Sequence, residues 1–120
     1  MNNEGLGIDI VEIDRIKQHF SKRFVQRILS PDEMILYDKM MSTKRQFEFL
    51  AGRFAAKEAY VKAYQRFDTA LNFKDVSILN DEFGAPYLSA PQSNDKVLIS
   101  ISHSDHYAVA VCSIKRGDLA

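Results

Sequence analysis

The segment 44–65, KRQFEFLAGRFAAKEAYVKAYQ, decides the fold. It contains no proline and Gly52 is its only glycine, so nothing breaks the long helix that its apolar periodicity predicts. Thr43 and Gln46 are placed to cap the start of this helix. On a helical wheel, the apolar side chains form one stripe that we expect to be buried. The stripe consists of Phe47, Leu50, Ala51, Phe54 and Val61.

A second apolar segment, 6–13, reads LGIDIVEI and predicts a β-strand, because it is rich in β-branched residues. We expect this strand to be buried on much of both faces. Side chains alternate along a strand, so Asp9 shares one face with Val11 and Ile13. The opposite face carries Leu6, Ile8 and Ile10.

Short helices and then strands are expected in the rest of the chain. Helices are predicted over 14–20 and 24–29, and a third begins at Ser30, where Glu33 completes a capping box, and ends by Met41. The expected strands are 73–79, 86–88, 97–102 and 107–114, with a hairpin turn at 81–84. An N-terminal strand, helices including one long helix, and then antiparallel strands make an α+β fold with helices on one face of a sheet.

The composition is that of a globular protein, and its 120 residues predict one domain over 1–120. Lysine and arginine number 16, as do aspartate and glutamate, and this neutral balance argues against a general nucleic-acid binder. The single cysteine, Cys112, excludes an intramolecular disulfide and reads as a small core residue. The N-terminus lacks a signal-peptide pattern and no apolar run suits a membrane span, so we expect a cytoplasmic protein.

Two carboxylates occupy positions where the pattern predicts core. Glu58 lies in the middle of the helical stripe, and Asp9 lies on the apolar strand. An uncompensated buried carboxylate is costly, so each needs a partner. A Mg²⁺ ion shared by both would neutralise them and leave open positions for a phosphorylated substrate. Ion pairs with Lys57 or Lys62 are the alternative.

The stretch 100–106, SISHSDH, lies where one predicted strand ends and the next begins. Hydroxyl groups and His103 at a strand end suit a phosphate contact, whereas a simple polar turn is the alternative. Zinc binding by His103, Asp105 and His106 lacks a further ligand cluster. A serine hydrolase would need a nucleophile elbow, and no G-x-S-x-G sequence is present.

All the charged side chains in the segment 15–27 are positive. Its basic residues are Arg15, Lys17, Lys22, Arg23 and Arg27, and it has no acidic residue. Phe20 and Phe24 are interleaved with them. Such a run is either a solvated helical face or a docking surface for an acidic macromolecule. The neutral chain favours an acidic protein over nucleic acid as the partner.

Four motifs stand in order along nearly the whole chain. They are GLGIDI at 5–10, FLAGRFAAKEA at 49–59, GAPY at 84–87 and SISHS at 100–104. Together they resemble the holo-acyl-carrier-protein synthases, the small class of 4′-phosphopantetheinyl transferases. One departure follows the long helix, where the family has a Gly-Thr-Gly turn near coenzyme A and this chain has AYQRFDTA at 63–70. Arg66 is placed to replace the missing backbone amides with a guanidinium.

The resemblance implies a Mg²⁺-dependent transfer of 4′-phosphopantetheine from coenzyme A to a serine of apo acyl carrier protein, which releases 3′,5′-ADP and serves fatty acid biosynthesis. Asp9 and Glu58 match the Mg²⁺ ligands. Glu58, or a water that it orients, would take the serine proton. Lys62 matches a lysine that helps the leaving phosphate.

The resemblance also implies how the substrates are bound. The positions around the coenzyme A phosphates are Arg53, Lys57 and His103. The acidic carrier would dock on the surface of Arg15, Arg23 and Arg27. The functional unit resembles a homotrimer with sites at subunit interfaces, where Arg53 would reach a neighbour's site. A non-catalytic carrier-binding or nucleotide-binding module, and an ion-paired protein without metal, are the alternatives.

Overall fold

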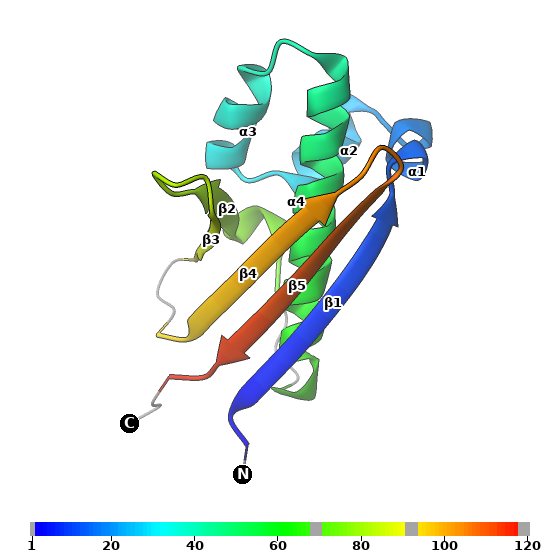
Figure 1. Ribbon diagram of the computed structural model, residues 1–120. Coiled ribbons are helices and arrows are strands. Elements are labelled where there is room, and N and C mark those ends of the chain that lie inside the picture. Colours follow the sequence, from blue (N-terminus) through cyan, green and yellow to red (C-terminus); the bar gives the residue numbers. More distant parts are fainter. Residues whose placement is uncertain (1, 68–70, 91–93, 118–120) are drawn as a thin grey trace.

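The computed structural model describes residues 2–67, 71–90 and 94–117 and has the predicted α+β architecture (Figure 1). The strands are β1 (Glu4–Glu12), β2 (Ser77–Asn80), β3 (Pro86–Ser89), β4 (Lys96–His103) and β5 (Tyr107–Lys115). The helices are α1 (Ile13–Gln18), α2 (Lys22–Ile28), α3 (Pro31–Asp38) and α4 (Thr43–Tyr64), with short 3₁₀ helices η1 (Gln65–Phe67) and η2 (Phe73–Asp75). Within the described residues, no helix is long and apolar enough to cross a membrane.

The main sheet has three antiparallel strands in the order β1-β5-β4. In Figure 1 the long helix α4, in green, runs behind this sheet, and the shorter helices gather at its upper end. Strands β2 and β3 form a separate antiparallel hairpin. The hairpin turn is the predicted one: Asp81 accepts hydrogen bonds from the backbone of Phe83 and Ala85, and Gly84 has a φ of 82°.

Small residues let α4 lie directly against β1. A Cβ atom added to Gly7 would lie 1.9 Å from the Ala59 carbonyl oxygen, and one added to Gly5 would lie 1.9 Å from that of Ala63. Larger side chains on either element would separate them. The glycines on the strand and the alanines on the helix therefore fix the distance between the two elements that carry Asp9 and Glu58.

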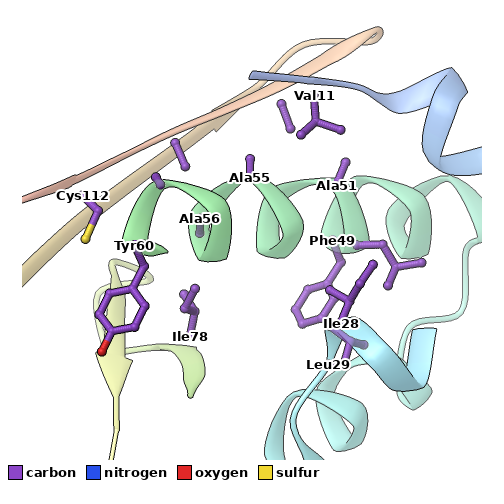
Figure 2. Packing of buried hydrophobic residues seen from close by; sticks show 14 of the residues in the cluster. Val11, Ile28, Leu29, Phe49, Ala51, Ala55, Ala56, Tyr60, Ile78 and Cys112 are labelled. Atoms are coloured by element: carbon purple, nitrogen blue, oxygen red, sulfur yellow. The ribbon is translucent and has the colours of Figure 1, made fainter. Parts of the chain in front are cut away.

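The buried face of α4 differs from the predicted stripe. Leu50 and Ala51 are fully buried, whereas Phe47, Phe54 and Val61 are only half-buried. The fully buried positions continue instead through alanines, which Figure 2 shows between the strands and the lower helices. They are Ala51, Ala55, Ala56 and Ala59. The predicted stripe was defined mainly by large apolar side chains. Close packing of a helix against a sheet instead requires small side chains at the contact.

The prediction that β1 is buried on much of both faces is wrong for the single chain. The helices cover one face of the sheet, and the other face is uncovered. Leu6, Ile8 and Ile10 are 71%, 62% and 65% exposed, and Leu98 and Val111 on the neighbouring strands are exposed with them. These five residues are called the outer sheet face below. A contiguous exposed aliphatic surface of this kind marks a protein-protein contact.

Two smaller expectations also need correction. Ser42, not Thr43, caps α4, since its hydroxyl accepts a hydrogen bond from the Arg45 backbone at 3.3 Å. The strand expected over 73–79 begins at Ser77, because Phe73–Asp75 forms the 3₁₀ helix η2. The predicted capping box of Ser30 and Glu33 is confirmed, and Cys112 is fully buried in the core.

Candidate active site

Asp9 and Glu58 line one cavity of about 410 Å³, which is called the carboxylate cavity below. It is bounded by β1, α1, α4 and the start of β5. Arg15 and Phe24 from the basic segment line it as well, as does Tyr107. The strand and the helix that the sequence singled out for odd carboxylates are therefore brought together at one opening.

Lys62 provides the ion pair that the sequence offered as one alternative. Its ammonium lies 3.0 Å from the Asp9 carboxylate and donates to the Ile8 carbonyl oxygen at 3.1 Å. The lysine side chain is 47% exposed, so the ion pair faces solvent. Asp9 thus has a partner, while its surroundings stay open to a ligand.

Glu58 is the uncompensated carboxylate. Within the described part of the chain, it makes no hydrogen bond or ion pair, and it is half-buried. Burial raises the pKa of this carboxyl, the negative charge of Asp9 raises it further, and Lys62 opposes both. Two carboxylates that raise each other's energy, with space beside them, fit a hard divalent cation such as Mg²⁺. The described residues contain no cluster of three or more metal-ligating side chains.

Lys57 is in a different environment from that expected for a coenzyme A contact. It is fully buried, and its ammonium lies 2.5 Å from the equally buried Glu33 carboxylate. The same ammonium donates to the carbonyl oxygens of Ile28 at 2.7 Å and Phe73 at 2.8 Å. A charge held by three acceptors inside the chain cannot contact a soluble ligand without leaving them. The structure places Lys57 in the interior and not in a binding cavity.

Arg53 and His103 line a second cavity, of about 380 Å³, called the cationic cavity below. The Arg53 guanidinium donates to the Ile78 carbonyl oxygen at 3.1 Å and to Asn80 at 2.9 Å, and it lies 4.2 Å from the centre of the Phe49 ring. Burial lowers the pKa of Arg53 to about 10, so the group stays charged at neutral pH.

The carboxylate cavity and the cationic cavity are separate within one chain. Asp9 is on β1 and His103 ends β4, and these strands form opposite edges of the sheet with β5 between them (Figure 1). Sequence reasoning also missed two residues of the cationic cavity, Arg45 and Glu48. Their i, i+3 spacing, which brings them 3.4 Å apart, was the signal that could have found them.

The basic segment forms α1 and α2 beside the carboxylate cavity, with its charged side chains exposed. Aromatic contacts attach it to the long helix: Phe20 packs edge-on against Phe47, and Phe24 stacks on Phe54. Phe20 remains largely exposed among the cations. The surface thus combines charge with an apolar anchor.

A third cavity, of about 660 Å³, lies at the other end of β1 and is lined by Lys62, Gln65 and Arg66. Arg66 donates to the Glu4 carbonyl oxygen at 3.1 Å. Lys62 therefore lies between this cavity and Asp9. Of the segment 63–70, which lacks the expected glycines, residues 68–70 lie outside the described residues.

Comparison with known proteins shows the family to which the chain belongs. Residues 5–112 match the 4′-phosphopantetheinyl transferase superfamily. The chain is 48% identical over 115 residues to a holo-[acyl-carrier-protein] synthase of Anoxybacillus flavithermus, with 93% of this chain and 95% of that protein covered. It is 46% identical over 109 residues to the synthase of Enterococcus faecalis, with 89% and 92% covered.

Among solved structures, a holo-(acyl-carrier-protein) synthase of Bacillus anthracis in complex with CoA (3′,5′-ADP) superposes with a TM-score of 0.83. It is 38% identical, and the match covers 94% of this chain and 96% of that one. The chain belongs to the 4′-phosphopantetheinyl transferase superfamily and, within it, to the holo-[acyl-carrier-protein] synthases.

Proposed function

We propose that the protein transfers 4′-phosphopantetheine from coenzyme A to a serine of an apo acyl carrier protein, giving holo carrier protein and 3′,5′-ADP. The relatives named above support this reaction, as does the complex of the Bacillus anthracis enzyme with CoA. The observation that carries the proposal is that Asp9 and Glu58 line one cavity beside an exposed basic surface, with Lys62 ion-paired to Asp9.

Asp9 and Glu58 are the residues that would hold Mg²⁺. When bound, the ion would supply positive charge to the pyrophosphate oxygens of coenzyme A. The raised pKa of Glu58 and its lack of a partner among the described residues support this assignment.

Three side chains have separate roles in the proposed reaction. Glu58, directly or through a water, accepts the proton of the carrier serine, since this carboxylate lines the cavity and has no hydrogen-bond or ion-pair partner among the described residues. Lys62 stabilises the charge that develops on the departing phosphate. Asp9 keeps the Lys62 ammonium in place through the 3.0 Å ion pair.

The cationic cavity supports a coenzyme A contact from a neighbouring subunit. Arg53 and His103 suit phosphate groups, yet they line a different cavity from Asp9, and His103 ends β4, which β5 separates from β1. Association through the outer sheet face would bury its exposed aliphatic residues and bring the cationic cavity of one chain toward the carboxylate cavity of another. We infer a homotrimer of this kind, as the family resemblance implies.

The carrier protein docks, in this proposal, on the surface of Arg15, Arg23 and Arg27. The surface is exposed and borders the carboxylate cavity, so a docked acidic protein would deliver its serine close to Glu58. Cations at such a rim increase the rate of encounter with an acidic partner. The reaction needs no secreted or membrane-bound state of the enzyme, and we place it in the cytoplasm.

Mass spectrometry tests the reaction. The purified protein is incubated with an apo acyl carrier protein, coenzyme A and Mg²⁺, and we expect the carrier to gain the mass of one phosphopantetheine. A carrier whose acceptor serine is replaced by alanine is the control and should gain nothing. An unmodified carrier at enzyme concentrations equal to the substrate would contradict the proposal and favour a non-catalytic binding module.

A further inference from the structure

Glu48 is a carboxylate in a place that otherwise favours anions. It is the only acidic side chain among the described residues that line the cationic cavity, where Lys39, Arg45 and Arg53 supply positive charge and His103 supplies an imidazole. Its side chain is only 10% exposed. A negative charge here would repel a phosphate group, so its presence calls for a compensating contribution.

The contacts of Glu48 indicate how it could favour phosphate binding. One carboxylate oxygen lies 3.4 Å from the Arg45 guanidinium, and the other lies 3.6 Å from Nδ1 of His103. Glu48 and Arg45 belong to α4, whereas His103 ends β4, so the carboxylate connects the helix to the edge strand. Because Nδ1 faces Glu48, the other ring nitrogen, Nε2, is left for a ligand.

We propose that Glu48 is a positioning residue, which holds the His103 imidazole through Nδ1 and Arg45 through its guanidinium so that both side chains address a phosphate group of coenzyme A. The inference rests on the proposed function, because it takes coenzyme A as the ligand of the cationic cavity. Glu48 acts through these two side chains and makes no contact with the substrate itself.

The sign of a mutational effect separates positioning from simple charge. Removal of a carboxylate that only repels phosphate would tighten coenzyme A binding. Removal of a positioning carboxylate releases the two phosphate-binding side chains, and we expect Glu48→Ala to raise the calorimetric Kd for coenzyme A about tenfold, with a similar rise in KM and kcat within about twofold. Glu48→Gln keeps an oxygen that can accept from Nδ1 and should recover most of the affinity.

Glu82 provides a matched control. It is an exposed carboxylate in the β2–β3 turn, two residues before Gly84, which lines the cationic cavity. Glu82→Ala removes a nearby charge without releasing a cation, so coenzyme A binding should stay the same or tighten slightly. Unchanged or tighter binding in Glu48→Ala would overturn the inference.

Nuclear magnetic resonance of the imidazole nitrogens gives a readout that does not depend on coenzyme A. In the neutral ring of the wild type, the proton of His103 should lie on Nδ1, facing Glu48, and in Glu48→Ala it should move to Nε2. The signals of His19 and His106 should not change. The same His103 tautomer in both proteins would overturn the positioning role. Wild-type protein that fails to bind coenzyme A would instead overturn the proposed function, so the two failures are distinguishable.

Discussion

Lys57 and Lys62 lie little more than one turn apart on α4, and each is paired with one carboxylate, yet their surroundings differ completely. Lys57 and Glu33 are both fully enclosed, and every acceptor of the lysine comes from the chain itself. Lys62 is about half exposed and lines the third cavity, and its partner Asp9 lines the carboxylate cavity. The comparison shows that a charged pair is structural where its bonding is complete inside the chain, and is free to act on a ligand where it borders a cavity.

The largest expected effect concerns the enclosed pair. Lys57→Met removes one partner and leaves the Glu33 carboxylate buried without its cation, so the free energy of unfolding should fall by about 3–5 kcal/mol. Urea denaturation measures this change. Lys62→Met is the matched control, and it should change stability by less than about 1 kcal/mol because its pair is exposed. Equal stability losses in the two variants would contradict the comparison.

The two carboxylates of the carboxylate cavity should show the opposite behaviour, with activity lost and stability kept. Glu58→Gln and Asp9→Asn each keep the side-chain shape and remove a charge, so transfer should fall by at least about 100-fold, or roughly 2.7 kcal/mol of transition-state stabilisation. Because Glu58 has no partner in the described residues, its variant should unfold at the same urea concentration as the wild type or a higher one. Turnover near the wild-type rate at saturating Mg²⁺ would rule out the shared ion.

Arg66 tests whether the role of Lys62 extends into the third cavity. Arg66 lines that cavity with Lys62. It follows the long helix, where the sequence resemblance leads one to expect a glycine turn. Arg66→Ala should weaken coenzyme A binding by about 1–3 kcal/mol, the scale of a charged hydrogen bond. Calorimetry measures the affinity, and Gln65→Ala, a neutral residue of the same cavity, serves as the control. If Arg66→Ala binds coenzyme A as tightly as the wild type does, the Arg66 guanidinium does not replace the missing backbone amides of the glycine turn.

The smallest effect is expected on the docking surface. Arg23 is exposed and does not line the carboxylate cavity, so Arg23→Glu should raise KM for the carrier severalfold and leave KM for coenzyme A unchanged. Added salt screens such charges, so the wild type should lose carrier affinity as salt rises and the variant should lose less. The same salt dependence in both proteins would contradict an electrostatic contribution of Arg23 to carrier binding.

Much of the fold could be predicted from the sequence because its signals are local. The unbroken helix predicted over 44–65 and the capping box at Ser30 each depend on neighbours in the chain, and both were confirmed. The uncovered outer sheet face could not be foreseen, since the alternation of Leu6, Ile8 and Ile10 reports apolar character and not what covers it.

The site was predictable to a similar extent. Asp9 and Glu58 were found because carboxylates at apolar positions are conspicuous, and the structure does bring them to one cavity. Lys57 was not distinguishable from Lys62, because the partner that encloses it, Glu33, is distant in sequence. The same limit applies to Glu48 and His103, which only the packing of α4 against β4 brings together.

The central claim is that each active site combines Asp9, Glu58 and Lys62 of one subunit with the cationic cavity of a neighbour. Mixed trimers test it directly. Glu58→Gln and His103→Ala should each be nearly inactive alone at low coenzyme A, since the first disables the carboxylate cavity and the second the cationic cavity.

Co-expression of the two variants with different affinity tags yields mixed trimers for a transfer assay. At equal amounts, about one quarter of the interfaces join two intact halves, so about one quarter of the wild-type activity should return. Mixed trimers no more active than the average of the two separate variants would contradict the account, because they would mean that each site is built within a single chain.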